Sequence, residues 1–283
     1  MLCTAKEILN DAREKRYAVP GFNCVADVMI RGILDRTECL RSPVFLMLLA
    51  GEIEERTWWY YPTIIRAVAE RYAIPIVMHL DHATELDDIR AALDHGFTSV
   101  MYDGSRLPFD KNVEMTRKTV EIAESYGASV EAELGLVGGA GMEMKANVAN
   151  ILTQPEEVVT FVERTAVDSL AVSIGTAHGV YQQLPKLDIP LLKELNAASP
   201  VPLVMHGGSG TPDDQVRAAI ENGICKFNIY TDCCVAMWNR FKQIAAEVEK
   251  NCPLPNNYIT QLQAALGDVV EEKATLAGSV GQA

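Results

Sequence analysis

The sequence has little positive charge, with 25 lysines and arginines against 38 aspartates and glutamates and a formal net charge of −13. Nucleic acid or an anionic membrane would favour a basic surface, so neither is expected as a partner. The chain also lacks any stretch near the roughly 20 apolar residues of a membrane-spanning helix, and its N-terminal segment has no apolar signal core. We therefore expect a soluble, cytoplasmic protein.

Two further absences concern cysteines and linkers. The seven cysteines are odd in number and contain no C-x-x-C pair, which predicts reduced thiols rather than a disulfide framework. The 283 residues contain no Pro/Gly/Ser-rich linker and no low-complexity segment. This length is normal for one (β/α)8 barrel, so we expect a single domain spanning residues 1–283.

Apolar runs alternate with segments of helical periodicity along most of the chain. The runs that read as strands are 17–23, 43–49, 74–80, 97–102, 129–134, 168–174, 201–206 and 224–230. The helical segments are 26–41, 57–72, 85–95, 110–126, 155–165, 188–198 and 212–222, followed by a long helical tail from 232. An open doubly wound sheet would show the same alternation. The count of eight strands favours an α/β TIM barrel with extra C-terminal helices.

Histidine is scarce, and three of the five histidines follow apolar runs. They are His82 in H-L-D-H, His178 in G-T-A-H-G and His206 in M-H-G-G-S-G. The carboxyl ends of barrel strands meet at one face, so these distant residues are expected to converge there. Three imidazoles plus an open position make a catalytic zinc site. Asp81, beside His82, would supply a proton-transfer group.

Other polar residues fall at the same predicted strand ends. They are Asn23, Asp103, Glu131, Glu133 and Asn228. Glycine-rich segments follow two of the histidines, with Gly179 after His178, and with Gly207, Gly208, Ser209 and Gly210 after His206. Glycine lets backbone N–H groups approach an anion closely, and a phosphate site near strands 7 and 8 recurs in barrels. Asn228 and Thr231 could add donors, although simple tight turns after strands would also explain the glycines.

With these residues in these positions, the chain resembles the class II, zinc-dependent ketose-bisphosphate aldolases of the tagatose/fructose-bisphosphate type. The matching motifs span nearly the whole chain in family order. They are V-P-G-F-N (19–23), H-L-D-H (79–82), S-V-M-Y-D-G-S (99–105), V-E-A-E-L-G (130–135), D-S-L-A-V-S-I-G-T-A-H-G-V-Y (168–181), V-P-L-V-M-H-G-G-S-G (201–210) and K-F-N-I-Y-T-D (226–232). Together these motifs are specific, although no single one would be.

The resemblance implies a role for each matching residue. His82, His178 and His206 would hold zinc, Asp81 would be the acid/base, and Asp103 and Glu133 match positions that hold a second divalent metal in some members. The dihydroxyacetone-phosphate half of the substrate would contact Asn23, Gly179, Gly207, Gly208, Ser209, Asn228 and Thr231. The implied reaction is reversible cleavage of a ketose 1-phosphate or 1,6-bisphosphate through a metal-stabilised enediolate. The resemblance also implies a small sugar phosphate as partner, a homodimer or homotetramer, and in some members a monovalent cation (Na⁺ or K⁺).

Three positions depart from the family pattern. Relatives carry a mobile acid after strand 5 where this chain has Gly141, and Glu143 is the nearest acid that could replace it. Relatives bind the distal phosphate through an arginine where this chain has Asn256, which lacks the charge and bidentate geometry for a phosphate. Tyr230 stands where relatives place an acid or a small residue. We therefore expect the aldehyde half of the substrate to differ from that of fructose bisphosphate.

Three other interpretations remain open from the sequence. Lys226 lies two residues before Asn228, so both could face the barrel interior, and a desolvated lysine could form a Schiff base as in class I aldolases. That mechanism gives no reason for three histidines at the rim. A non-catalytic sugar-phosphate-binding barrel is disfavoured because Asp81 and the histidines are all present. A zinc hydrolase is weakly disfavoured because no additional water-activating base is obvious.

Overall fold

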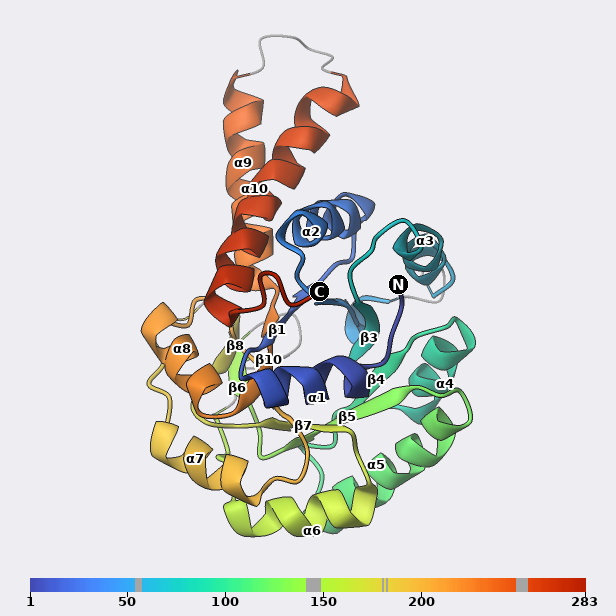
Figure 1. Ribbon diagram of the computed structural model, residues 1–283, viewed down its shortest axis with the longest axis vertical. Helices are drawn as coiled ribbons and strands as arrows, with labels where there is room; N and C mark the ends of the chain where they lie inside the picture. The colour runs from blue at the N-terminus through green and yellow to red at the C-terminus, as the bar shows by residue number, and fades with distance from the viewer. Residues whose placement is uncertain (54–57, 141–148, 180, 182, 248–253) are drawn as a thin grey trace.

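In the computed structural model, eight parallel strands close into a barrel in the order β1-β10-β9-β7-β5-β4-β3-β2 (Figure 1). The structure describes residues 1–53, 58–140, 149–179, 181, 183–247 and 254–283. The barrel strands are β1 (Val19–Asn23), β2 (Val44–Leu49), β3 (Ile76–Ala83), β4 (Ser99–Tyr102), β5 (Ser129–Leu134), β7 (Ser169–Val172), β9 (Leu203–Met205) and β10 (Ile224–Ile229). The predicted TIM barrel is confirmed.

A helix follows each barrel strand and covers the outside of the barrel. These helices are α2 (Asp27–Leu40), α3 (Tyr60–Ala69), α4 (Leu86–Asp94), α5 (Phe109–Glu124), α6 (Pro155–Thr165), α7 (Ile189–Ala198), α8 (Asp213–Glu221) and α9 (Thr231–Glu247). A short 3-10 helix, η1 (Ala50–Glu52), comes directly after β2. Strands of such a barrel are buried on both faces, which explains why they appear in the sequence as continuous apolar runs.

The predicted C-terminal helical tail is α9 together with α10 (Pro255–Ala277), and the two helices project from the barrel side by side (Figure 1). The lower half of α10 packs against α2, with Leu266 and Val270 fully buried. Among the described residues, no helix is long and apolar enough to cross a membrane.

Besides η1, one helix and one pair of strands were not predicted from the sequence. The first is α1 (Ala5–Lys15), which begins with a capping box between Thr4 and Glu7 and lies across one end of the barrel (Figure 1). It buries Leu9 in a cluster with barrel residues such as Phe45. The second is a pair of short parallel strands, β6 (Gly138–Ala140) and β8 (Ala177–Gly179), formed by the segments after β5 and β7. His178 therefore lies on β8, outside the barrel sheet.

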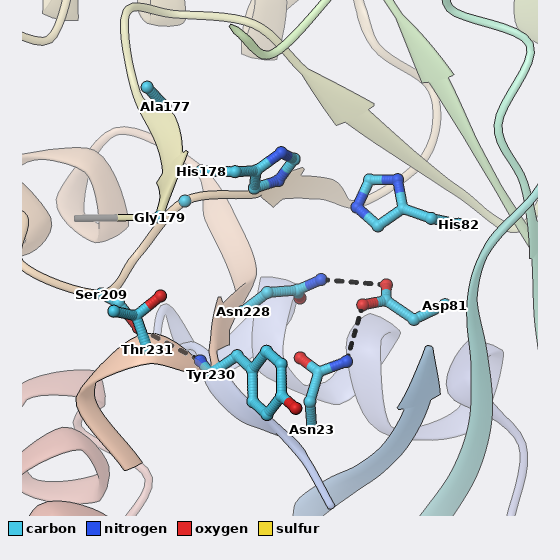
Figure 2. Close-up of a pocket in the computed structure, with 11 residues that line it drawn as sticks. Asn23, Asp81, His82, Ala177, His178, Gly179, Ser209, Asn228, Tyr230 and Thr231 are labelled. Atoms are coloured by element: carbon cyan, nitrogen blue, oxygen red, sulfur yellow. Dashed lines mark hydrogen bonds between the residues drawn. The ribbon is translucent and has the colours of Figure 1, made fainter. Parts of the chain in front are cut away.

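Strand β3 is longer than predicted and is irregular near its end. The apolar run suggested an end at residue 80, but the strand continues to Ala83, with a register shift between Leu80 and Ala83. His82 has a φ of +52°, in the left-handed region that non-glycine residues seldom adopt. A regular strand would send Asp81 and His82 to opposite faces, whereas here both line the same pocket (Figure 2).

Candidate active site

The three histidines predicted from the sequence meet at the carboxyl ends of the barrel strands. Each of His82, His178 and His206 offers a ring nitrogen within 4.8 Å of those of the other two. The ring centroid of His82 lies 5.1 Å from that of His178 and 4.6 Å from that of His206. They come from β3, β8 and the residue after β9, so the closed barrel brings together residues far apart in the sequence.

Carboxylates fix the orientation of two of these imidazoles. Nδ1 of His82 lies 2.9 Å from Oδ2 of Asp103, whose other oxygen accepts hydrogen bonds from the backbone and hydroxyl of Ser105. A carboxylate can only accept, so Nδ1 of His82 carries a proton. Burial lowers the pKa of His82, but the charge of Asp81 and the contact with Asp103 outweigh it and raise that pKa, so Nε2 must lose a proton before it can hold a metal. The contacts with His82 and Ser105 lower the pKa of Asp103 despite its burial.

His206 is held by a buried ion pair. Its Nε2 lies 2.9 Å from Oε1 of Glu131, and Oε2 of the same carboxylate lies 2.8 Å from Nζ of Lys226. All three side chains are completely buried. Nε2 of His206 therefore donates to Glu131, which leaves the lone pair on Nδ1. A metal-ligating histidine is commonly oriented in this way by a carboxylate.

The unsatisfied atoms in this cluster fit a bound cation. Nδ1 of His206 and Oε2 of Glu133 are buried without a hydrogen-bond partner among the described residues, although only 3.5 Å separates them. Burial, together with the charge of nearby Asp103, raises the pKa of Glu133 to about 8. Burial and the positive charge of His82 lower the pKa of both His178 and His206, which keeps these rings neutral. Neutral imidazoles with converging lone pairs are what zinc requires.

Asp81 lies beside the histidines and is held from two sides. Its Oδ2 accepts a hydrogen bond of 2.9 Å from the side-chain amide of Asn23, and its Oδ1 accepts one of 3.2 Å from that of Asn228 (Figure 2). Only 2% of the Asp81 surface is exposed. Two amide donors from β1 and β10 thus fix the carboxylate with its face toward the pocket.

Glycines and a helix N-terminus form the other side of the pocket. Gly179 and Gly207 have φ values of +87° and +69°, and a Cβ on Gly207 would lie 2.5 Å from the backbone oxygen of Ala177. Oγ of Ser209 accepts from the backbone N–H groups of Tyr230 and Asp232, which places this loop against the first turn of α9. Backbone amides and the N-terminus of a 17-residue helix favour an anion at this place.

The structure brings most of the predicted site residues into one pocket. The described residues that line it are Asn23, Asp81, His82, Ala177, His178, Gly179, Gly207, Ser209, Asn228, Tyr230 and Thr231 (Figure 2). Gly208 is not among the described residues that line the pocket, and its N–H donates to the Asn228 carbonyl. Asp103 and Glu133 line an adjoining cavity that His82 and His178 also contact.

Three predictions fall elsewhere. Gly141 and Glu143 lie outside the described residues. Asn256 is in the first turn of α10 and is not one of the described residues that line the pocket. Lys226 is fully buried in its ion pair with Glu131, which confirms its predicted position in the barrel interior. It is not one of the described residues that line the pocket, so it is not exposed to a substrate there.

Sequence reasoning missed two contributors to the site. Glu131 was recognised as polar but given no role, because its contact with His206 spans 75 positions. Glu52, at the end of η1, accepts a hydrogen bond of 2.7 Å from the hydroxyl of Tyr230, and nothing in its local sequence marks it.

A parallel barrel with three converging histidines and a buried carboxylate at its rim is the architecture of a metal-site enzyme. The sequence model of the family described as fructose-bisphosphate aldolase class-II matches residues 3–282. The chain therefore belongs to the class II fructose-bisphosphate aldolase family and is an aldolase that catalyses aldol cleavage. Two alternative interpretations of the sequence are therefore wrong. In one, Lys226 forms a Schiff base as in class I aldolases, and in the other the barrel is not catalytic.

Solved structures agree with this assignment. The YdjI aldolase from Escherichia coli K12 has 32% identity and a TM-score of 0.89, with both chains covered completely. A protein from Coccidioides immitis, thought to be a fructose-1,6-bisphosphate aldolase, has 27% identity and a TM-score of 0.86, with 98% of this chain and 97% of that chain covered. Fructose-bisphosphate aldolase from Campylobacter jejuni shares the fold at 21% identity, with a TM-score of 0.85 and coverage of 100% and 97%.

Proposed function

We propose that the protein is a zinc-dependent aldolase that reversibly cleaves a ketose 1-phosphate into dihydroxyacetone phosphate and an aldehyde. The observation that carries the proposal is the convergence of three imidazoles beside a buried, doubly hydrogen-bonded Asp81. His82, His178 and His206 would hold the metal. Zinc bound there would act as a Lewis acid on the substrate's carbonyl and hydroxyl oxygens.

Asp81 would move the proton that cleavage requires. In cleavage its carboxylate takes the proton of the C4 hydroxyl, the C4–O bond becomes a carbonyl, and the electron pair of the C3–C4 bond goes to C3. In condensation Asp81 returns the proton. Asn23 and Asn228 hold both carboxylate oxygens, so the acid/base has one orientation. Protonation at C3 needs a second acid, for which Glu143 stays our proposal from the sequence.

The glycine side of the pocket would bind the phosphate of the dihydroxyacetone-phosphate half. Gly179, Gly207 and Ser209 present backbone and hydroxyl groups beside the start of α9, and Thr231 is the first residue of that helix. Holding the phosphate there places the reacting carbons between the histidines and Asp81, which keeps the substrate in register.

Asp103 and Glu133 support the metal site in this proposal. Asp103 already accepts from Nδ1 of His82, so its best-supported role is to orient that ring. A second divalent ion held by His82, Asp103 and Glu133 would have to replace this contact, and the proposal therefore contains one zinc ion.

A screen of condensation tests the proposal directly. The zinc-loaded enzyme is incubated with dihydroxyacetone phosphate and a panel of aldehydes, and the ketose 1-phosphates formed are measured. Removing zinc with a chelator should abolish the reaction and adding it back should restore it. Asp81→Asn should retain zinc but turn over far more slowly. Unchanged condensation after zinc removal, or inactivation by borohydride with substrate, would overturn the zinc mechanism.

We further propose that the chain forms a homo-oligomer through the outer face of α9. Trp238 and Phe241 stack on that helix with ring centroids 5.7 Å apart, and 59% and 44% of their surfaces are exposed. Exposed aromatic clusters of this kind are typical of interfaces between subunits. Sedimentation of Trp238→Ala beside the wild type tests this, and a monomeric wild type would contradict it.

A further inference from the structure

The pocket that would hold the phosphate of the substrate has no cationic side chain in its wall. Among the described residues that line it, none is a lysine or an arginine. Backbone N–H groups and the start of α9 must therefore supply the attraction for an anion there. However, Asp232, the second residue of α9, places a carboxylate at the same helix end. A carboxylate at a helix N-terminus competes with a bound anion for the helix dipole and repels that anion at short range.

Two hydrogen bonds in opposite directions join Asp232 to the glycine loop, which comprises residues 207–210. The backbone N–H of Asp232 donates to Oγ of Ser209 over 3.2 Å. In return, Oδ2 of Asp232 accepts from the backbone N–H of Gly210 over 3.3 Å. Ser209 lines the pocket, whereas Asp232 is not one of the described residues that do. Asp232 therefore holds the glycine loop against α9 without lining the pocket itself.

A buried lysine on α10, the helix that packs beside α9, pairs with this carboxylate (Figure 1). Nζ of Lys273 lies 3.1 Å from Oδ2 of Asp232 and 2.9 Å from Oε1 of Glu272. Only 7% of the Lys273 side chain is exposed, so solvent screens its attraction to Asp232 less than at the surface. Burial lowers the pKa of Lys273, but Glu272 and Asp232 outweigh it and raise that pKa, so the ammonium keeps its charge.

We propose that Lys273 is a positioning residue for the phosphate of the substrate and acts through Asp232. The ammonium neutralises the Asp232 carboxylate and holds it on Gly210, which leaves the dipole of α9 and the backbone N–H groups of the glycine loop to the phosphate. Without the ammonium, an unbalanced negative charge stands at the anion site. The inference rests on the proposed aldolase reaction and deepens it, because it makes phosphate binding depend on a charge outside the pocket.

Exchange of the C3 proton of dihydroxyacetone phosphate with deuterium tests this, because it needs no aldehyde. NMR follows the exchange on the zinc-loaded enzyme over a range of substrate concentrations, which gives KM and kcat separately. Lys273→Met should raise KM roughly threefold to 30-fold, as expected for an added charge at a helix N-terminus, and should leave kcat nearly unchanged. The inhibition constant of inorganic phosphate should rise by the same factor. Lys273→Arg, which keeps the charge, should stay close to the wild type.

A double variant separates the charge of Lys273 from its packing. Asp232→Asn with Lys273→Met removes both charges, and the amide oxygen of the asparagine can still accept from Gly210. KM should then return most of the way to the wild-type value, because the two sites are coupled. If Lys273 acted only by packing α10, or attracted the phosphate directly, the double variant would bind phosphate as weakly as Lys273→Met.

Controls separate this inference from the proposed function. Lys193→Met makes the same charge change at an exposed position on α7 and should leave KM unchanged. Thermal unfolding shows whether each variant is folded, and Lys273→Gln, whose amide can still donate to Asp232, replaces Lys273→Met if that variant is not. Absence of exchange in the wild type would overturn the proposed function and this inference with it. With exchange present, an unchanged KM in Lys273→Met, or no recovery in the double variant, would overturn the role of Lys273 alone.

Discussion

Removing the carboxylate of Glu131 should destabilise the zinc-free protein strongly. The carboxylate bonds Nζ of Lys226 at 2.8 Å and Nε2 of His206 at 2.9 Å, and all three side chains are 0% exposed. In Glu131→Ala the lysine ammonium stays buried, and among the described residues its remaining favourable contact is with the ring of Phe45, whose centroid lies 5.1 Å from Nζ. Breaking a buried pair in this way costs about 3–5 kcal/mol.

A double variant separates the loss of charge balance from the loss of contact. In Glu131→Gln with Lys226→Met both charges are removed together, and the amide oxygen of the glutamine can still accept from His206. Replacing a buried pair by neutral groups of similar size is often nearly neutral. The double variant should therefore recover most of the stability that Glu131→Ala loses, and the two sites should show strong coupling.

Urea and thermal unfolding in the presence of a chelator measure these effects without a contribution from bound metal. Each kcal/mol of lost folding stability lowers Tm by roughly 2–4 °C in a chain of this size. A loss of about 3–5 kcal/mol therefore means that Glu131→Ala should melt roughly 6–20 °C below the wild type. Competition with a chromophoric chelator should also show zinc bound about 10–100-fold more weakly. The reasoning is refuted if Glu131→Ala costs under about 1 kcal/mol, or if the double variant is equally unstable.

Three further perturbations test the site. Asp81→Asn keeps the side-chain shape but removes the base, so kcat/KM for cleavage should fall by roughly 10²–10⁴-fold. The zinc content, measured by atomic absorption, should stay unchanged. Normal turnover would show that Asp81 is not the acid/base. His178→Ala should leave the purified protein with far less than one zinc ion per chain, and full retention would exclude it as a ligand. Gly207→Ala places a Cβ 2.5 Å from the Ala177 backbone oxygen at a φ of +69°. This clash should displace the loop and raise KM for the phosphorylated substrate. An unaltered KM would show that this loop does not bind the phosphate.

The barrel was predictable because its signal is local. Each buried strand appears as an apolar run, and the glycines at 96, 127 and 223 before three of them have the positive φ expected after a helix. The convergence of His82, His178 and His206 followed from the barrel alone, since that fold collects the ends of its strands at one face. Helix α1 was missed although its capping box is local, because no predicted strand precedes it.

The residues that orient the side chains of the site could not be predicted from the sequence in the same way. Glu52 meets Tyr230 across 178 positions, and Lys226 meets Glu131 across 95. Their partners are set by which strands become neighbours and by how far each loop reaches, neither of which is encoded in a local pattern. Lys226 shows the consequence, because its position two residues before Asn228 correctly indicated the barrel interior but suggested a nucleophile where the structure has a counter-ion.

The irregular end of β3 explains how one strand can supply both the proposed base and a proposed zinc ligand. The positive φ of His82 costs about 1–3 kcal/mol, so the surrounding contacts must hold it. Asn23 and Asn228 hold Asp81 on one side of the irregularity, and Asp103 holds His82 on the other. A regular strand would relieve the strain, but it would turn either Asp81 or His82 out of the pocket. In the proposed mechanism this strain allows proton transfer by Asp81 and metal binding by His82 to act on adjacent atoms of one substrate.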